Sequence, residues 1–336
     1  MNVPDHWLVM RLSALGDVVL TTGVLDYLYK KYGWRFTFLT YAPWAPVLER
    51  HPAIDKVIGI TKDEVRSGNI RPFFRKLVEE HEGDGFLDLH GTLRSRRLAF
   101  MWKGKVLRYP KFSLQRRLFL ASGGKLGGQK LLKYNVPQRY ALATEGQAPS
   151  RQELLPHIYL SVDEQEYGQK LKADIAAKKP LVALHPFSTH PNKAWLDSYW
   201  CKLAEGLVSR GAHVCVVGVG KSPVRSMDGV TDLTGKTTLR ETCAVLAESD
   251  MLVTGDSGPM HLAGGVGTPV VALFGPTHKA WGFYPEGAAD VVLEAKESCR
   301  PCSLHGKKLC GKDHICMRSL TPELVLQRIE VLLNQK

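Results

Sequence analysis

Residues 250–277 constrain the fold of this chain more than any other stretch. Two short apolar runs, 251–253 and 270–274, enclose a polar loop at 256–258 and a segment with helical character. Pro259 suits the first turn of that helix because proline has no N–H group to leave unpaired. A strand, a helix and a second strand in this order predict two parallel strands joined by a helix.

The start of the predicted helix also suits an anion. Free backbone N–H groups and the helix dipole point at a ligand placed there, and residues 256–258 are small or polar. One interpretation is therefore a binding site for a diphosphate group. The plain alternative is a capped helix of an α/β domain that binds nothing.

The same alternation of strands and helices extends through both halves of the chain. Apolar runs predict further strands, in chain order, at 7–12, 35–40, 56–60, 85–89, 181–184 and 214–217. The alternation predicts an α/β fold of two Rossmann-like domains. Their parallel sheets would face a cleft and bind ligands at the carboxyl ends of the strands.

The chain has 336 residues, which is long enough for about two domains. Residues 143–156 are poor in large apolar side chains and form the predicted interdomain region. We therefore expect one domain at 1–160 and a second at 161–320. A final amphipathic helix is expected within residues 321–336.

Charge is distributed unevenly along the chain. The net charge is +12, and residues 89–144 contain thirteen Lys or Arg residues and no Asp or Glu. Such a stretch attracts an anionic partner, which can be nucleic acid, lipid headgroups or a phosphorylated substrate. A solvated basic face without a specific partner is the alternative.

The sequence shows no sign of membrane insertion or secretion. No uninterrupted apolar run approaches the ~18–20 residues that span a bilayer. The N-terminus lacks the basic and then apolar pattern of a signal peptide. We therefore expect a cytoplasmic protein.

Asp17 is the first candidate for chemistry. It follows the first predicted strand, at the sheet edge where ligands bind in such folds. A carboxylate there can act as a general base on a hydroxyl group, a role worth roughly 10²–10⁴-fold in rate. Alternatively, Asp17 only complements the dipole of the helix that it begins.

Two further loops carry polar side chains at predicted strand ends. In one, Ser188 and Thr189 offer hydroxyl donors, and Lys193 offers a compact cation for phosphate oxygens. The alternative for these residues is a helix cap and a surface lysine. The other loop, 232–239, joins a strand to a helix and could form part of a nucleotide pocket.

Several common motifs are absent or broken. Residues 218–222 resemble part of a phosphate-binding loop or dinucleotide fingerprint, but Pro223 interrupts both. The sequence also contains no H-E-x-x-H motif and no acidic pair suited to a metal.

Seven cysteines fall into two groups. Three lie in predicted helices or strands and are expected to be buried: Cys201, Cys215 and Cys243. Four others have the spacing C-x2-C-x7-C-x5-C: Cys299, Cys302, Cys310 and Cys316. In a reducing compartment this second group suggests either a structural zinc site or reduced thiols in a local fold.

Taken in order, the motifs resemble glycosyltransferase family 9, the heptosyltransferases that extend the inner core of lipopolysaccharide. The matching stretches cover nearly the whole chain and lie at 11–19, 88–95, 193–195, 233–237, 256–263 and 274–277. The segment 256–277 carries the strongest likeness. Gly23 and Phe187 depart from the residues that many relatives have at these positions.

The resemblance implies a GT-B architecture with the acceptor on the N-terminal domain and the nucleotide-sugar on the C-terminal one. It also implies an inverting reaction that needs no metal and no cofactor. Asp17 would be the general base, and Lys193 would stabilise the departing diphosphate. The expected donor-binding residues are Ser188, Thr189, Gly235, Lys236, Thr237, Asp256, Ser257, Gly258 and His261.

The implied acceptor is a phosphorylated, lipid-linked core oligosaccharide, and the implied donor is ADP-heptose. Acceptor-binding residues are expected at His90, Arg94 and Arg97. The basic stretch would bring the enzyme to the cytoplasmic face of the anionic inner membrane, and no nucleic acid is expected as a partner.

Three alternatives remain at this point. The first is a transferase of the same fold with another nucleotide-sugar and acceptor. The second is a GT-B-like epimerase or an NAD-dependent oxidoreductase, although the broken glycine fingerprint argues against NAD. The third is a basic protein that binds nucleic acid or anionic membrane, which leaves Asp17 and Lys193 without a role.

Overall fold

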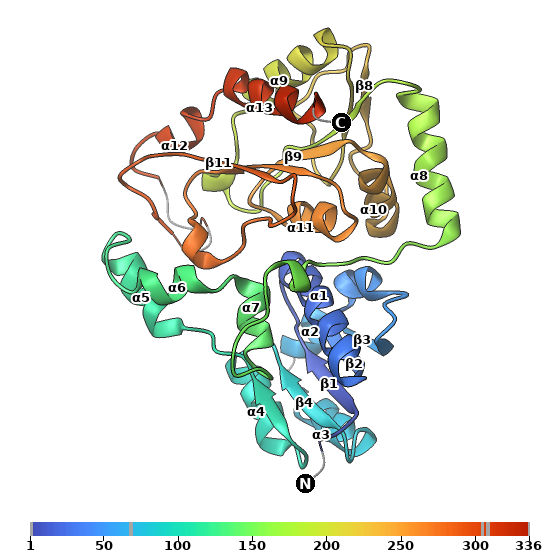
Figure 1. Cartoon of the computed structure of the whole chain (residues 1–336), viewed down its shortest axis with the longest axis vertical. Coiled ribbons are helices and arrows are strands. Elements are labelled where there is room, and N and C mark those ends of the chain that lie inside the picture. The colour runs from blue at the N-terminus through green and yellow to red at the C-terminus, as the bar shows by residue number, and fades with distance from the viewer. Residues whose placement is uncertain (1–2, 67–69, 304–305, 307–309, 335–336) are drawn as a thin grey trace. The chain divides into compact units, whose positions relative to one another are not determined.

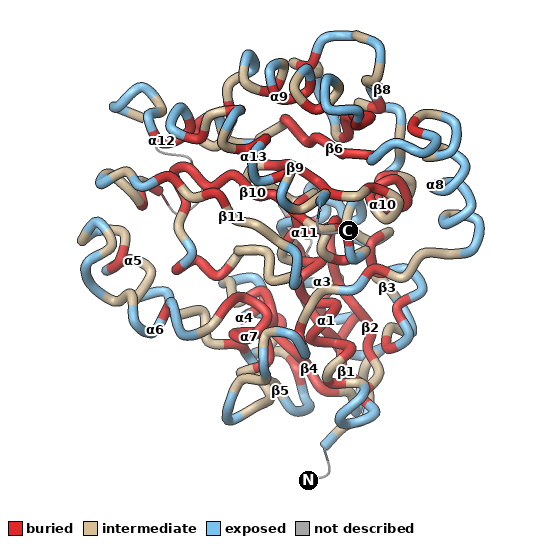
Figure 2. The backbone as a smooth tube through the Cα atoms, turned by 45° about the horizontal axis from the view of Figure 1, so that its top comes forward, coloured by how far each residue is buried: buried red, intermediate tan, exposed pale blue. Residues whose placement is uncertain are grey.

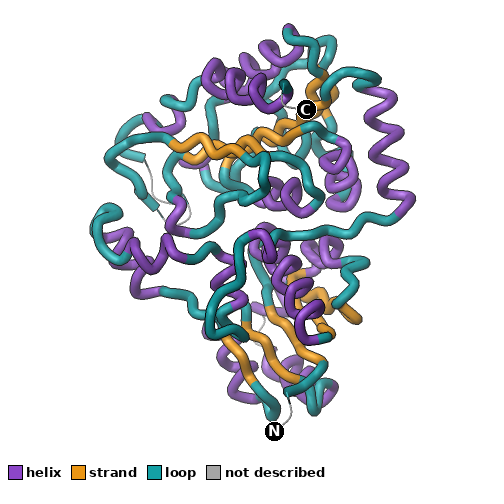
Figure 3. The backbone as a smooth tube through the Cα atoms, in the orientation of Figure 1, coloured by secondary structure: helices purple, strands orange, loops and turns teal. Residues whose placement is uncertain are grey.

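The computed structural model describes residues 3–66, 70–303, 306 and 310–334. The chain forms two compact units, each built around a parallel sheet (Figures 1 and 3). Unit 1 contains Met1–Lys111 and Val136–Tyr159, and unit 2 contains Phe112–Asn135 and Leu160–Lys336. The α/β class and the two parallel sheets predicted from the alternation are confirmed.

The described elements of unit 1, in chain order, are β1 His6–Met10, α1 Leu15–Tyr32, β2 Arg35–Tyr41, η1 Ala42–Leu48, β3 Ile54–Ile60, α2 Lys62–Arg66, α3 Ile70–Glu80, β4 Gly85–Asp88, α4 Leu93–Met101, β5 Val106–Arg108, α7 Val136–Ala141 and η2 Gln152–Leu154. The sheet order is β3-β2-β1-β4-β5, and all paired strands are parallel.

The central strands of unit 1 are buried on both faces, which explains their continuous apolar sequences (Figure 2). Successive side chains alternate between the faces. Leu8 and Met10 of β1 join a core with Phe74 and Leu77 of α3 and Leu98 of α4. The helices therefore hold β1 and β4 side by side in the interior of the sheet.

The described elements of unit 2 are α5 Ser113–Ala121, α6 Gly128–Lys133, α8 Val162–Ile175, β6 Leu181–His185, η3 Pro191–Lys193, α9 Asp197–Ser209, β7 His213–Val216, β8 Val230–Asp232, α10 Leu239–Glu248, β9 Met251–Gly255, α11 Gly258–Gly265, β10 Val270–Phe274, η4 Lys279–Trp281, β11 Val291–Glu294, α12 Ile315–Arg318 and α13 Pro322–Leu333. The sheet order is β11-β10-β9-β6-β7-β8, again with parallel pairs.

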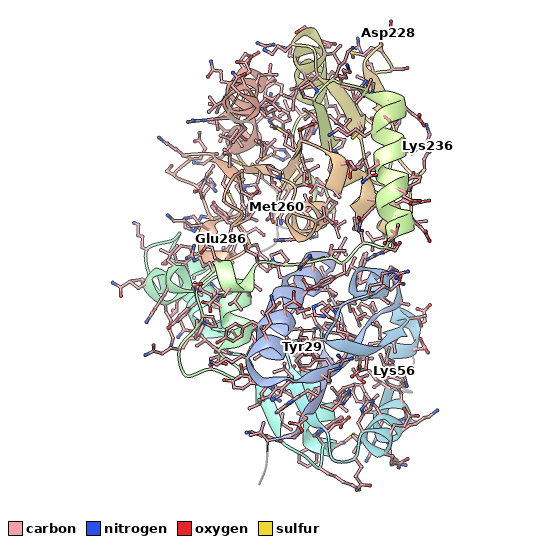
Figure 4. The ribbon with its side chains drawn as sticks, turned by 45° about the vertical axis from the view of Figure 1, so that its right-hand side comes forward. Tyr29, Lys56, Asp228, Lys236, Met260 and Glu286 are labelled. Carbon is pink, nitrogen blue, oxygen red and sulfur yellow. The ribbon has the colours of Figure 1, made fainter. Side chains whose placement is uncertain are left out.

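Helices cover both faces of the unit 2 sheet. Figure 1 shows α9 and α13 on one side of the strands and α10 and α11 on the other. Trp200 of α9 and Ile329 of α13 pack with Val182, Val214 and Val253 of three neighbouring strands. On the other side, Met260 of α11, labelled in Figure 4, is fully buried.

The segment 112–135 belongs to unit 2, whereas the sequence placed it within a first domain at 1–160. Phe119 of α5 and Leu131 of α6 form a small core with Ala280 and Trp281 of η4. The rings of Phe119 and Trp281 meet edge to face with their centroids 5.5 Å apart.

Within the described residues, no helix is both long and apolar enough to cross a membrane.

Residues 154–157 of unit 1 return to α1. The Thr22 hydroxyl accepts a hydrogen bond from the His157 N–H at 2.8 Å. Gly23 is the next residue of α1. A Cβ on Gly23 would lie 2.1 Å from the Leu155 carbonyl oxygen and 2.6 Å from that of Leu154. Glycine is therefore required at this position, because the backbone of 154–155 leaves no room for a side chain.

We predict that Gly23→Ala lowers the free energy of unfolding by about 1–3 kcal/mol, because the added methyl group forces the backbone of 154–155 to move. Urea unfolding followed by circular dichroism measures this difference. Gly146→Ala is the matched control, since a Cβ at Gly146 meets nothing within 4 Å. Its effect should stay within about 0.5 kcal/mol, and equal effects of the two variants would contradict the packing argument.

Candidate active site

The order of the strands places one loop cluster in each unit. In parallel α/β sheets, ligands bind outside the carboxyl ends of the strands where the strand order reverses. That point lies between β1 and β4 in unit 1 and between β6 and β9 in unit 2. The loops that follow these four strands carry most of the residues expected from the sequence.

Asp17 lies in the first turn of α1, just after the β1 loop. Its Oδ1 atom lies 2.6 Å from the Arg11 guanidinium and accepts a hydrogen bond from the Tyr140 hydroxyl at 2.9 Å. Its Oδ2 atom accepts the Ala14 N–H at 3.0 Å. The carboxylate is thus fixed in orientation, and Oδ2 is its less engaged oxygen.

The environment of Asp17 keeps it ionised. Burial alone would raise the pKa of this carboxyl group, but the charge of Arg11 and the hydrogen bonds from Ala14, Arg11 and Tyr140 lower it below its ordinary value. Arg11 also donates to the Leu89 carbonyl oxygen at 2.8 Å, which ties the β1 loop to the end of β4. A carboxylate held in this way can accept a proton at neutral pH.

The β4 end is organised by the buried side chain of Asp88. Its Oδ1 atom accepts the N–H groups of His90 and Gly91 at 3.0 and 2.8 Å. Its Oδ2 atom accepts from the Ser95 hydroxyl at 3.0 Å and the Arg108 guanidinium at 2.7 Å. These bonds fix the loop that carries His90 and the start of α4.

His90 is held neutral in unit 1. Burial, followed by the charge of Arg11, lowers the pKa of its imidazole to about 4. Its Nδ1 atom is buried and has no hydrogen-bond partner. Arg94 and Arg97 are exposed and lie one turn apart on α4, so they present two cations on the same side of the helix.

In unit 2, Lys193 and Asp256 form a close ion pair. The ammonium group of Lys193, at the end of η3, lies 2.5 Å from the Asp256 carboxylate and 3.4 Å from its carbonyl oxygen. Each side chain is 14% exposed. The pair joins the loop after β6 to the loop after β9, directly before the N-terminus of α11.

Ser257 precedes α11 but its side chain does not cap the helix. The hydroxyl instead lies 3.0 Å from the Thr254 hydroxyl and 3.3 Å from Nδ1 of His185. Burial lowers the pKa of His185 to about 4, so this ring is neutral. Because Ser257 points toward the sheet, its side chain does not compete with an anion for the N–H groups of Gly258 and the first turn.

The other expected donor residues lie at different depths. Ser188 bonds within its own loop, Thr189 is exposed, and His261 is buried in α11. Gly235 and Lys236 are exposed in the loop between β8 and α10, with Lys236 labelled in Figure 4. Thr237 is half-buried, and its hydroxyl lies 2.9 Å from that of Thr242 in α10. The structure thus places Lys193, Asp256 and Ser257 together, while residues 235–237 are held by local bonds.

The broken glycine motif has a packing role. Gly218 and Gly220 have positive φ angles of 127° and 138°. A Cβ on Gly218 would lie 2.6 Å from the ring of Phe187, and a Cβ on Gly220 would lie 3.1 Å from it. These glycines therefore leave room for the ring of Phe187, a packing role that needs no bound dinucleotide.

Several residues of both clusters carried no individual role in the sequence analysis. They are Arg11, Asp88, Arg108, Tyr140, His185 and Thr254. Arg11 and Asp88 stand within the stretches 11–19 and 88–95 on which the resemblance rests, so a signal was present but did not indicate what these residues do. Tyr140 has no such signal, because it reaches Asp17 from 123 residues away.

Comparisons with known proteins identify the family of this chain. The family model for glycosyltransferase family 9 (heptosyltransferase) matches residues 73–312. Lipooligosaccharide heptosyltransferase 2 of Haemophilus influenzae is 28% identical, over 97% of this chain and 99% of its own length.

Two solved structures show the same fold. A family 9 glycosyl transferase from Veillonella parvula gives a TM-score of 0.80 at 21% identity, over 100% of this chain and 99% of its own. The E. coli ADP-heptose lps heptosyltransferase II gives 0.73 at 22% identity, over 98% and 99%. The two-sheet α/β architecture is therefore that of GT-B glycosyltransferases.

Proposed function

Because the chain belongs to glycosyltransferase family 9, the heptosyltransferases of the lipopolysaccharide core, we propose that it transfers heptose from ADP-heptose to an inner-core acceptor. The observation that carries the proposal is the convergence of Lys193 and the N-terminus of α11 at the strand-order reversal of unit 2. This arrangement suits a diphosphate. The E. coli structure is named for ADP-heptose, which supports the same donor here.

We propose that the donor binds unit 2 through its diphosphate. As the sugar leaves, the electron pair of the breaking bond between the anomeric carbon and oxygen passes to the terminal phosphate of ADP. Lys193 and the N–H groups at the start of α11 stabilise this growing charge. Asp256 holds Lys193 in place, and a bound diphosphate competes with Asp256 for the ammonium group. With these groups, no divalent cation is needed for the leaving group.

The acceptor hydroxyl is proposed to lose its proton to Asp17. The acceptor oxygen forms the new bond on the face of the anomeric carbon opposite the departing ADP, which inverts that centre. Oδ2 is the accepting atom, because Oδ1 already takes both the Arg11 and Tyr140 bonds. Arg11 keeps Asp17 ionised before the reaction.

Acceptor phosphate groups are proposed to bind near the β4 end of unit 1. His90 is fixed there by the Asp88 network, and Arg94 and Arg97 offer exposed cations on α4. Guanidinium groups suit phosphate because of their paired donors. This assignment gives part of the basic stretch 89–144 a specific ligand.

We predict that Asp17→Ala leaves ADP-heptose binding intact and lowers the transfer rate at least about a hundredfold, because the general base is lost. Binding is measured by calorimetry and transfer by release of ADP. Asp26→Asn is the matched control on the same helix, where Asp26 accepts a hydrogen bond from Tyr159. Unchanged transfer in Asp17→Ala would remove Asp17 as the base.

Lys193→Ala is expected to weaken ADP binding and to slow transfer, since it removes the cation that stabilises the diphosphate. The expected loss of affinity is about tenfold or more. Lys202→Ala, an exposed lysine on α9, should change neither quantity. If both quantities stay the same in Lys193→Ala, the donor site lies elsewhere.

A peripheral contact with the cytoplasmic face of an anionic inner membrane is part of the proposal. On α5 of unit 2, Leu114 and Leu118 are 64% and 45% exposed. They stand among basic side chains, including Arg117 and Lys130, in a stretch without any acid. Exposed leucines with lysine and arginine are the composition of surfaces that bind anionic membranes.

We predict that Leu114→Glu with Leu118→Glu lowers binding to vesicles containing anionic lipid at least about tenfold. Flotation with the vesicles measures the bound fraction. Val331→Glu, which alters another exposed apolar residue on a helix of the same unit, should bind normally. Equal binding of wild-type protein to neutral vesicles would contradict the electrostatic part of the proposal.

A further inference from the structure

The proposed reaction leaves one strong feature of the chain unexplained. Four cysteines follow β11 and end in α12, and we name them the cysteine cluster: Cys299, Cys302, Cys310 and Cys316. All four lie in the described part of unit 2 and form no disulfide. Their spacing, with an initial C-x2-C pair, is that of a chain segment that wraps around a metal ion.

Two members of the cluster are fixed against the loop after β10. The Cys302 N–H donates to the Pro276 carbonyl oxygen at 3.3 Å. The Cys316 sulfur would lie 3.2 Å from a Cβ on the neighbouring Gly275. Cys299 is close to Cys302, because the Cys302 thiol lies 3.2 Å from the Cys299 carbonyl oxygen. Cys302 and Cys316 therefore both lie beside the loop after β10, and Cys299 lies next to Cys302.

Cys310 is tied by backbone hydrogen bonds to the chain that leads to Cys316. Its sulfur accepts two backbone N–H groups, from Lys312 at 3.4 Å and from His314 at 3.3 Å. His314 stands two residues before Cys316, so these bonds bring Cys310 toward the rest of the cluster.

Arg300, which lies between Cys299 and Cys302 in the chain, is already fully engaged. Its guanidinium group bonds the carbonyl oxygens of Gly275, Ala295 and Thr277 and the Glu294 carboxylate. A bound cation, and not Arg300, would therefore balance the charge of four ligating thiolates.

A second group in unit 1 has ligand atoms at closer spacing. Among the residues that the structure describes, only His6, His81 and Asp84 form a set of three within 4.8 Å of one another. Both imidazole Nδ1 atoms already lie at hydrogen-bond distance from one Asp84 oxygen, at 2.8 and 2.7 Å. The hydrogen bonds to Asp84 therefore explain that group without a metal ion.

At Gly306 the chain lies against a residue of the proposed donor site. Gly306 lies between Cys302 and Cys310 in the chain and has a positive φ of 77°. A Cβ on Gly306 would lie 2.7 Å from Cγ of Lys193 and 3.1 Å from its Cε. The backbone at Gly306 therefore packs along the stem of the lysine proposed to stabilise the leaving group.

We propose that the cysteine cluster binds one tetrahedrally coordinated Zn²⁺ or iron ion, and that this ion holds Gly306 against Lys193. Four thiolates select these two metals. Zn–S bonds of about 2.3 Å place the sulfurs about 3.8 Å apart, so binding contracts the cluster. Each ligating thiol releases its proton to solvent. The site itself is independent of the proposed function, while its effect on Lys193 rests on that function.

The first experiment measures the metal content of the full-length protein, purified and then incubated with Zn²⁺ under reducing conditions and desalted. We expect about one equivalent of zinc or iron per chain. Cys302→Ser and Cys310→Ser should each lose the metal, and Cys201→Ser, outside the cluster, should keep it. Wild-type protein with less than about 0.2 equivalents of both metals would overturn the site.

A second measurement does not depend on how the variants fold. Metal is removed from wild-type protein with a chelator and replaced by Co²⁺. Tetrahedral thiolate coordination gives intense visible absorption together with sulfur-to-cobalt charge transfer, and we expect both. Weak absorption of the octahedral type would overturn the proposed ligand set, whatever the enzymatic activity.

The coupling to Lys193 is tested by ADP affinity. Metal removal should weaken ADP binding severalfold in wild-type protein, and restoring Zn²⁺ should reverse the loss. In Lys193→Ala, removal should cause no further change, because the side chain that the ion positions is absent. If the cluster binds a metal ion and removal of that ion leaves ADP affinity unchanged, the coupling is refuted. Failure of the proposed donor role would not alter the metal content.

Discussion

The reversal of strand order in each parallel sheet is the constraint on which the sites depend. Parallel strands end at the same edge, and an order reversal leaves two adjacent strand ends without a connection across them. In unit 1 this brings the β1 loop, with Asp17, beside the β4 end. In unit 2 it brings the loop of Lys193 beside Asp256 and α11. The pairing of the strands thus determines which loops lie side by side, whichever side chains those loops carry.

Charge pairing then fixes the side chains of both proposed sites. A buried charge is costly unless it has a partner, and losing one partner destabilises the other. Asp17 is paired with Arg11, Asp88 with Arg108 and Lys193 with Asp256. Such pairs add little net stability compared with apolar packing. Their presence at both strand-order reversals therefore points to substrates that carry charge.

Sequence patterns predicted the central strands because those strands are buried on both faces and read as continuous apolar runs. The short strands β5 and β11 lie at the sheet edges, are partly exposed and lack such a run, so they were not predicted. The final helix and the start of α10 at Thr238 were predicted because capping residues mark them. Cys215 and Cys243 are buried as expected, but Cys201 is only half-buried.

Contacts between residues distant in the chain were not predictable from local patterns. Nothing around Phe119 or Leu131 indicates which core they join, and they pack with η4 of unit 2. Tyr140 on Asp17 and Leu155 against Gly23 arise only when the chain returns to α1. The sequence motifs indicated Asp17, Lys193 and Asp256. The side chains that bond to Asp17 could be identified only from the folded structure. The same is true of the contact between Gly306 and Lys193.

The central claim is the transfer of one heptose from ADP-heptose to a lipopolysaccharide core acceptor. Mass spectrometry of the acceptor after incubation with the protein and ADP-heptose tests it most directly. The account predicts that the acceptor gains the mass of one heptose residue while ADP appears in equal amount. An acceptor of unchanged mass, or a gain only with a different nucleotide-sugar, would contradict the account.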